Sequence, residues 1–348
     1  NSEVDKKVIN AIKKSNMSTL NNYEEVLLAE KLLDLHGWAG KAKFARSGAE
    51  ANTIALRIAR CNTNRQNVAI CGYHGWHDWY LSINLAGNGL DEHLLPGLDP
   101  AGVPSDLKDS VFPFRYNNFE ELEKLVSDKD IGVIKMEVQR NDPPKDNFLK
   151  KVRDLATKKN IVLVFDECTS GFRQTYGGLH KKFGVEPDMA MFGKAMGNGY
   201  AVTAVIGKKE IMESAQTTFI SSTFWTERIG SVAALTTLEV MKEMESWKIL
   251  PKVGLSIKDN LQKLANSYKL DIDISGIDPL PSFSFKTENN LAYKTYISQE
   301  LLKNGYLFAN AFYICTEHTP QVMDDFYNIL DKVFNKLKEF EEGEDVSN

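Results

Sequence analysis

The sequence lacks several features that mark other classes of protein. No apolar run approaches the roughly 18 residues that a membrane-spanning helix needs, and no block of basic residues suits the phosphate backbone of a nucleic acid. The 42 basic and 47 acidic residues are scattered along the chain and give a formal net charge of −5. Only four cysteines occur in 348 residues, without a C-x-x-C pair, which favours a reducing cytoplasm over a disulfide framework. We therefore expect a cytoplasmic protein that binds neither membrane nor nucleic acid.

Common nucleotide and metal motifs are missing as well. No G-x-G-x-x-G follows the first apolar strand, which argues against a nicotinamide dehydrogenase. A G-x-x-x-x-G-K-[ST] phosphate loop is excluded because Asp188 occupies its first glycine position and Ala195 follows Lys194. His74 and His77 are spaced like metal ligands, but no third ligand lies at a suitable spacing and there is no H-E-x-x-H. We expect no metal site.

Short apolar runs rich in β-branched residues alternate with helical patterns over the first two thirds of the chain. The runs are Val68 to Cys71, Ile131 to Glu137, Ile161 to Asp166, Met189 to Phe192 and Val202 to Gly207. Residues 148 to 159 place apolar side chains at helical spacing and supply a crossover between the second and third runs. This alternation predicts an α/β fold, a largely parallel, doubly wound sheet flanked by helices.

The last third of the chain has a different pattern. A long helical stretch runs from Ile229 to about Ser267 and is expected to break near Pro251. A proline-rich segment at Pro279 and Pro281 and a shorter region of strand and helix follow it. We predict a large domain over residues 1–245, and a linker helix with a small α+β domain over residues 246–348.

The first candidate site residue is Asp166, a carboxylate at the C-terminal end of an apolar strand. Ligands of open α/β sheets bind at that end of the strands. Burying an aspartate costs several kcal/mol unless a cation pairs with it, and a protonated ring nitrogen of a cofactor is such a cation. The alternative interpretation is an aspartate that caps the following turn.

The second candidate is Lys194, which follows another apolar strand and precedes the glycine-rich turn of Gly197 and Gly199. It would lie beside the carboxylate of Asp166 at the same edge of the sheet. Desolvation lowers the pKa of a lysine and so exposes the neutral amine that forms an imine with an aldehyde. Taken alone, a Gly-Lys pair before a turn is more often a surface lysine.

Two further segments could surround a cofactor. Ser47 and Glu50 form a capping box before a strongly helical pattern, which predicts that a helix starts at Ser47 with free amides suited to a phosphate. An ordinary capped helix is the commoner reading of this pattern. The aromatic, glycine-rich segment of residues 72–78 follows the first apolar run, and its Tyr73 is suited to stacking on a flat heteroaromatic ring.

In this order the four segments resemble the class III aminotransferases of fold type I, most closely the branch that contains glutamate-1-semialdehyde aminomutase. The matching motifs are Ser-Gly-Ala-Glu-Ala at 47–51, Gly-Tyr-His-Gly-Trp-His-Asp at 72–78, Phe-Asp-Glu-Cys-Thr-Ser-Gly-Phe-Arg at 165–173 and Pro-Asp-Met-Ala-Met-Phe-Gly-Lys at 187–194. The resemblance extends from Glu3 to about Trp247 and more loosely beyond. It implies an enzyme that uses pyridoxal 5′-phosphate, with pyridoxamine 5′-phosphate as the intermediate form of the cofactor.

The resemblance also implies a role for each matching residue. Lys194 forms the Schiff base with the cofactor and later moves the proton, and Asp166 keeps the ring nitrogen protonated. Tyr73 stacks on one face of the ring, and Cys168, where the family usually has valine, contacts the other. We therefore take Lys194, Asp166 and Tyr73 as catalytic residues. The cofactor-binding set also includes His74 and Glu137.

For the cofactor's phosphate, the resemblance implies contacts from Ser47 and from the amides of Gly48 and Ala49. Thr223 matches a threonine that this family donates across a dimer to the phosphate of the partner subunit. A homodimer is therefore implied. The family also has an N-terminal segment of several tens of residues that lines the substrate entrance, and we expect such a segment to be absent from this sequence.

Two departures from the family pattern lie on the substrate side. Residues 224–227, Phe-Trp-Thr-Glu, stand where the family has a Gly-Asn-Pro turn, and Val138 replaces the proline after Glu137. The departures favour transfer of an amino group from an amino acid to a carbonyl acceptor, such as a keto sugar or another intermediate of polysaccharide or secondary metabolism. The alternative is the aminomutase reaction, in which one molecule loses one amine and gains another. A non-catalytic homologue is disfavoured because both Lys194 and Asp166 are present.

Overall fold

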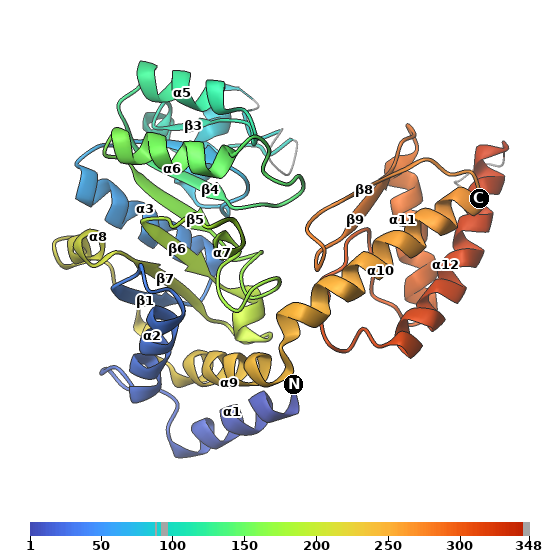
Figure 1. Cartoon of the computed structure of the whole chain (residues 1–348), viewed down its shortest axis with the longest axis horizontal. Helices are drawn as coiled ribbons and strands as arrows, with labels where there is room; N and C mark the ends of the chain where they lie inside the picture. Colours follow the sequence, from blue (N-terminus) through green and yellow to red (C-terminus); the bar gives the residue numbers. More distant parts are fainter. Residues whose placement is uncertain (88, 92–96, 344–348) are drawn as a thin grey trace. The chain divides into compact units, whose positions relative to one another are not determined.

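The computed structural model describes residues 1–87, 89–91 and 97–343 (Figure 1). The chain divides into two compact units. The first contains residues 1–140 and 144–244, and the second contains residues 141–143 together with the chain from residue 245 onward. Within the described ranges, every helix is too short or too polar to cross a membrane.

A seven-stranded sheet forms the centre of the first unit. Its strands are β1 (Lys41–Ala45), β2 (Asn67–Cys71), β3 (Val111–Pro113), β4 (Ile131–Glu137), β5 (Val162–Asp166), β6 (Met189–Phe192) and β7 (Thr203–Gly207), in the order β1-β7-β6-β5-β4-β2-β3. Strands β3, β2, β4, β5 and β6 are parallel, whereas β7 runs antiparallel to β6 and β1. The predicted α/β fold with a largely parallel sheet is confirmed.

The five predicted strands are β2, β4, β5, β6 and β7, each within one residue of its expected bounds. Strand β1 was not predicted. Its sequence, Lys-Ala-Lys-Phe-Ala, has few β-branched residues, and its first three residues are only half-buried because β1 lies at an edge of the sheet. Strand β1 forms because the backbone of β7 is available for pairing, which local sequence does not reveal.

Helices cover both faces of the sheet. The helices of this unit are α1 (Ser2–Lys14), α2 (Tyr23–Leu35), α3 (Gly48–Thr63), α4 (Asp78–Leu81), α5 (Phe119–Asp128), α6 (Phe148–Lys158), α7 (His180–Phe183), α8 (Lys209–Met212) and α9 (Arg228–Met244). Apolar residues of α3 pack on one face of the sheet, and those of α2 and α9 pack on the other. Helix α1 lies along α9 (Figure 1). The predicted crossover helix is α6.

The second unit has its own hydrophobic core, rich in phenylalanine. It consists of α10 (Ser246–Ser267), an antiparallel hairpin of β8 (Ile272–Ser275) and β9 (Ser282–Phe285), α11 (Asn290–Lys303) and α12 (Pro320–Glu341). The expected helix break near Pro251 was wrong. The break is at Glu245, whose φ is +49°, and Pro251 is accommodated as the sixth residue of α10.

Candidate active site

The start of α3 has the capping geometry that its sequence predicts. The Ser47 hydroxyl accepts a hydrogen bond from the Glu50 amide at 3.3 Å, and the Glu50 carboxylate accepts one from the Ser47 amide at 2.9 Å. The amides of Gly48 and Ala49 lie in the first turn, where no carbonyl of the same helix can accept from them. They therefore point, with the positive end of the helix dipole, toward a place suited to an anion.

Asp166 is the last residue of β5 and lies in register with Glu137 on β4 and Met191 on β6. It is 5% exposed, and its carboxylate accepts a hydrogen bond from the Cys168 amide at 3.1 Å. Burial acts to raise the pKa of Asp166, but the hydrogen bond with His74 and the positive charge of Lys135 outweigh it and hold the pKa well below the usual range. Asp166 is therefore a buried carboxylate that stays ionised.

The fully buried imidazole of His74 holds this carboxylate through its Nδ1 atom, 2.9 Å from Asp166 Oδ2. Burial, with the positive charge of Lys135, lowers the pKa of His74 to about 4, so the ring is neutral near pH 7. A neutral imidazole beside a carboxylate carries its proton on the nitrogen that faces it. Its Nε2 is buried without a hydrogen-bond partner among the described residues. His74 thus holds the carboxylate of Asp166 in a fixed orientation.

The loop after β2 reaches β4 through Tyr73 and Glu137. The Tyr73 amide donates to Glu137 Oε2 at 3.1 Å, and Arg140 donates to Glu137 Oε1 at 2.7 Å. Burial raises the pKa of Glu137, although the positive charge of Arg140 opposes it. Gly72, with φ +106°, is required here because a Cβ would lie 2.6 Å from Glu137 Oε2. The ring of Tyr73 meets Tyr80 edge-on, with centroids 5.9 Å apart.

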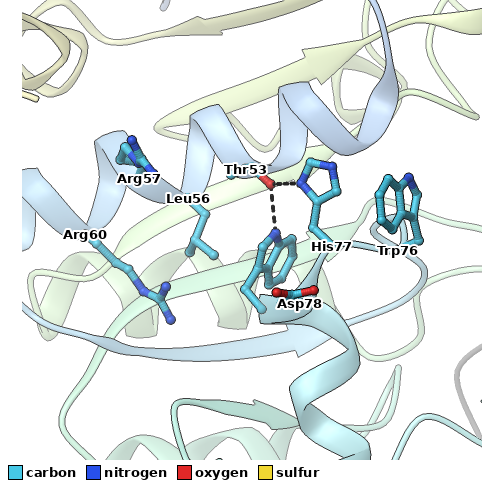
Figure 2. A pocket seen from close by; sticks show the side chains of 8 residues that line it. Thr53, Leu56, Arg57, Arg60, Trp76, His77 and Asp78 are labelled. Carbon is cyan, nitrogen blue, oxygen red and sulfur yellow. Dashed lines mark hydrogen bonds between the residues drawn. The ribbon is translucent and has the colours of Figure 1, made fainter. Parts of the chain in front are cut away.

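The same loop is anchored on α3 by Thr53 (Figure 2). The Thr53 hydroxyl lies 2.6 Å from His77 Nδ1 and accepts from Trp79 Nε1 at 2.9 Å. These residues line a pocket of about 560 Å³ on the outer side of α3, together with Leu56, Arg57, Arg60, Trp76 and Asp78. His74 and His77 therefore have different partners, and the described residues contain no cluster of three or more potential metal ligands.

Lys194 follows β6 directly after Gly193 and begins the short 3-10 helix η3 (Lys194–Gly197). Its backbone is in the left-handed region, with φ +41°, which is unfavourable for a lysine and is held by the surrounding turn. The side chain is exposed, so the expected desolvation of Lys194 was wrong for this structure, and its Nζ donates a hydrogen bond to Thr169 Oγ1 at 2.7 Å. Thr169 stands three residues after Asp166, so the amine lies over the loop that leaves β5.

Cys168 shows that the separate segments converge. A Cβ placed on Gly48 would lie 3.9 Å from Cys168 Sγ, and one placed on Gly193 would lie 3.7 Å from the same sulfur. Cys168 therefore separates the start of α3 from the turn that carries Lys194. The structure brings together the helix start, the loop after β2, the end of β5 and the lysine turn, which are far apart in the sequence.

Thr223 is not part of this convergence within the chain. It begins the 3-10 helix η5 (Thr223–Thr226), is exposed, and among the described residues makes no hydrogen bond to the other predicted site residues. Arg46 lies next to the start of α3, and its guanidinium binds the backbone carbonyls of the segment that contains Thr223. The guanidinium donates to the carbonyl oxygens of Phe224, Trp225 and Glu227 at 2.9, 3.0 and 2.8 Å.

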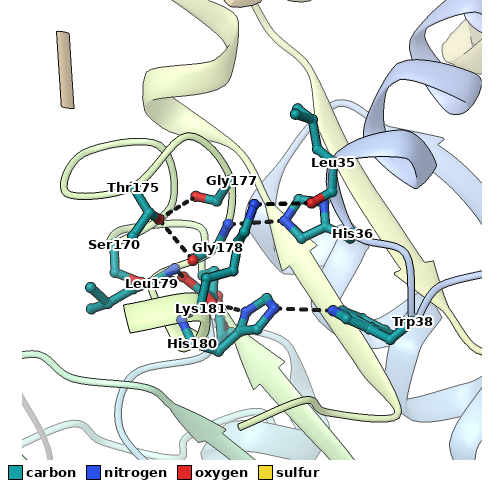
Figure 3. Close-up of polar contacts among 12 residues, drawn as sticks. Leu35, His36, Trp38, Ser170, Thr175, Gly177, Gly178, Leu179, His180 and Lys181 are labelled. Carbon is teal, nitrogen blue, oxygen red and sulfur yellow. Dashed lines mark hydrogen bonds and ion pairs between the residues drawn. The ribbon is translucent and has the colours of Figure 1, made fainter. Parts of the chain in front are cut away.

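A buried polar cluster supports the loop after Asp166 (Figure 3). The His180 ring contacts the fully buried carboxylate of Glu167 through Nδ1 and accepts from Trp38 Nε1 at 3.1 Å. His36 accepts from the Gly178 amide at 2.9 Å. Burial lowers the pKa of His36 to about 4, so this ring is also neutral near pH 7. These satisfied contacts fix the loop that carries Cys168 and Thr169.

Sequence reasoning missed three residues of this region. Thr169, the hydrogen-bond acceptor for Lys194, lies inside the quoted motif at 165–173 and could have been singled out there. Arg140 follows Glu137 by three residues, a spacing that allows an ion pair. Lys135 is a lysine within an otherwise apolar strand, and that anomaly was visible in the sequence.

Comparison with known proteins decides the family. The family described as "Aminotransferase class-III" matches residues 2–326. The chain belongs to the class III aminotransferases. It is 33% identical to 3-aminobutyryl-CoA aminotransferase of Cloacimonas acidaminovorans, over 92% of this chain and 77% of that protein. It is 28% identical to glutamate-1-semialdehyde 2,1-aminomutase of Hyperthermus butylicus, over 90% of this chain and 79% of that protein.

Solved structures agree in fold. The FumI protein of Sphingopyxis sp. MTA144 superposes with a TM-score of 0.87 at 20% identity, covering 99% of this chain and 82% of that one. An omega-transaminase from Sphaerobacter thermophilus superposes with a TM-score of 0.85 at 21% identity, covering 96% and 83%. Class III aminotransferases depend on pyridoxal 5′-phosphate, so this class III aminotransferase is a pyridoxal-phosphate enzyme.

The residues of the site fit this cofactor. Asp166 offers a buried anion for a protonated ring nitrogen, and the α3 start offers unpaired amides for a phosphate. A Cβ placed on Gly48 would meet only the sulfur of Cys168, at 3.9 Å, among described atoms outside its chain neighbours and the α3 backbone, so the helix start is not crowded on that side. The exposed amine of Lys194 is accessible to an aldehyde.

Proposed function

We propose that this class III aminotransferase transfers an amino group from an amino-acid donor to a carbonyl acceptor, with Lys194 as the amine that bonds to the cofactor's aldehyde. The observation that carries this proposal is the placement of an exposed lysine amine and a buried ionised carboxylate on two neighbouring strand ends. Either residue alone has an ordinary structural explanation. Their convergence with an anion-binding helix start does not.

The cofactor, when bound, draws electrons from the reacting carbon into its ring. Asp166 holds a proton on the ring nitrogen by its negative charge, and His74 keeps Asp166 in position through the 2.9 Å contact. With the cofactor bound, the amine of Lys194 would move the proton at the substrate carbon. Thr169 holds the amine over the site through its 2.7 Å hydrogen bond.

Further contacts would fix the orientation of the cofactor. We assign the phosphate to Ser47 and the amides of Gly48 and Ala49, because the helix start is both unpaired and positively polarised. Tyr73 and Cys168 are assigned to the two faces of the cofactor's ring. The carboxylate of Glu137 positions Tyr73 by accepting a hydrogen bond from the Tyr73 backbone amide. The cytoplasmic location stays a prediction from the sequence.

We also propose a homodimer in which Thr223 reaches the phosphate of the partner subunit. Two observations support this. Thr223 is exposed, and the segment around it presents the large apolar side chains of Phe219 and Phe224, which are 83% and 61% exposed. Arg46, the residue before Ser47, donates a hydrogen bond to the Glu227 carbonyl, so this segment adjoins the phosphate region.

Hybrid dimers test the origin of Thr223. Thr223→Ala is expected to weaken the binding of pyridoxal phosphate by about 10- to 150-fold, since a typical hydrogen bond to a charged group contributes about 1.5–3 kcal/mol. Mixing Thr223→Ala and Lys194→Ala subunits should restore one tight site per hybrid dimer, because the subunit with an intact Lys194 receives Thr223 from its partner. Ser222→Ala is the matched control. Absence of this restoration in verified hybrids would show that Thr223 does not act across the dimer.

The acceptor is the least constrained part of the proposal. Relatives named 3-aminobutyryl-CoA aminotransferase and 2′-deamino-2′-hydroxyneamine transaminase, the latter from Streptomyces kanamyceticus at 26% identity over 86% of this chain and 74% of that protein, support an intermolecular reaction. We therefore propose a keto sugar or a keto-acyl thioester as acceptor. Several relatives named glutamate-1-semialdehyde 2,1-aminomutase, at 27–30% identity, make the intramolecular reaction the second candidate.

Separate half-reactions distinguish these candidates. With L-glutamate or L-alanine as the sole substrate, an intermolecular aminotransferase should convert all bound cofactor to its amine form and release one equivalent of oxo acid per site. Adding a keto sugar or keto-acyl thioester should then regenerate the starting absorbance. Turnover of glutamate-1-semialdehyde without any donor, and without exchange of labelled glutamate nitrogen, would instead establish the aminomutase reaction.

A further inference from the structure

A fully buried lysine lies beneath the cofactor site. Lys135 is the fifth residue of β4, and all its neighbours on that strand are buried. In the part of the chain that the structure describes, the only hydrogen-bond partner of its ammonium is the thioether sulfur of Met191, 3.4 Å away. A thioether is a weak acceptor, so this sulfur does not compensate a buried positive charge.

The sheet places Lys135 on the same face as the site carboxylates. Side chains alternate between faces along a strand, so Lys135 and Glu137 share a face. Asp166 lies in register with Glu137 and with Met191, and therefore belongs to that face too. This is the face on which α3 packs. The ammonium is thus enclosed between the sheet and α3, with two carboxylates at the same strand ends.

The charges around Lys135 leave Asp166 as its electrostatic partner. Glu137 already pairs with Arg140 at 2.7 Å, and His74 is neutral near pH 7. Four ionisable groups interact electrostatically with Lys135. They are Asp166 at the end of β5, Cys168 in the loop after β5, Glu137 on β4, and His74 in the loop after β2. Burial lowers the pKa of Lys135 to about 8, even though the negative charge of Asp166 acts to raise it.

We propose that Lys135 is a positioning residue that acts as the internal counter-cation of Asp166 and releases its proton to solvent when the ring cation of the cofactor pairs with that carboxylate. This inference rests on the proposed function, since it takes Asp166 as the partner of the ring nitrogen. If Lys135 kept its proton when the cofactor bound, the two buried carboxylates at the strand ends would face three cations: Arg140, Lys135 and the ring of the cofactor. Of the two cations that the chain itself supplies, the ammonium of Lys135 deprotonates more easily than the guanidinium of Arg140.

Calorimetric titration of the cofactor-free protein with pyridoxal phosphate measures this proton directly when it is repeated in buffers of different ionisation enthalpy. A group with a pKa of about 8 is about three quarters protonated at pH 7.5. At pH 7.5, wild type is therefore expected to release about 0.7 proton per site more than Lys135→Met. At pH 9.5, the two proteins should release the same number of protons. The ratio of the wild-type dissociation constant to that of Lys135→Met should fall by up to about fourfold over this range.

Met191→Leu removes the sulfur contact but keeps the charge, and should release protons as wild type does. Lys135→Gln provides a second uncharged variant should Lys135→Met not fold by circular dichroism. If wild type and a folded, uncharged variant both bind the cofactor tightly and release equal numbers of protons at pH 7.5, the role of Lys135 is overturned. The proposed function would remain intact. Binding that is unaffected by Asp166→Asn would contradict the proposed function itself, and this inference with it.

Discussion

Replacing Lys194 with alanine is expected to abolish turnover and the absorbance that the cofactor acquires on bonding to a lysine. The side chain has two tasks in the proposed reaction, and alanine performs neither. Proton transfer by a positioned side chain contributes about 10²- to 10⁴-fold on its own, so kcat should fall by at least about 10²-fold. The absorbance spectrum and single-turnover kinetics with L-glutamate measure both losses.

The fold should survive this replacement because Lys194 is exposed and outside the core. Alanine also keeps a Cβ at a position with φ +41°, so it neither relieves nor adds much backbone strain. Lys182→Ala is a matched control, since Lys182 is an exposed lysine on α7. A Lys194→Ala protein that turns over like wild type would refute the assignment of the cofactor to this residue.

Replacing Asp166 with asparagine is expected to lower kcat/KM by about 150- to 5,000-fold, because removing one partner of a buried charge pair typically costs about 3–5 kcal/mol. Asparagine has nearly the same shape and retains an oxygen that accepts from the Cys168 amide. It lacks the charge that keeps a ring nitrogen protonated. The pKa of His74 should fall further, since Asp166 acts to raise it. Steady-state kinetics and a cofactor-binding titration measure the loss.

Asp188→Asn controls for loss of a buried carboxylate elsewhere. Asp188 is also 5% exposed and pairs with Arg153 and Lys208 at 2.9 and 2.8 Å, at the opposite ends of β5 and β6. Its replacement should lower the free energy of unfolding without changing the affinity for the cofactor. Equal losses of cofactor affinity in the two variants would mean that Asp166 acts only through stability.

Much of the large unit follows from local sequence. Apolar, β-branched runs predict the interior strands because these strands are buried on both faces, and a serine three residues before a glutamate predicts the start of α3. Edge strand β1 escaped prediction because its pairing with β7 is non-local. The helix break escaped it too, because Glu245 takes a left-handed conformation that nothing in its residue type demands.

The sequence by itself indicated the family and predicted Lys194, Asp166 and Ser47 as site residues, because the bonds that these residues make depend on their type and their place at an element end. Only the tertiary structure decided which groups act on them. His74 lies 92 positions from Asp166 yet orients it, Thr169 receives the amine of Lys194, and Lys135 lies beneath the site. Burial and charge decide these roles, and both depend on which strands are neighbours in the sheet.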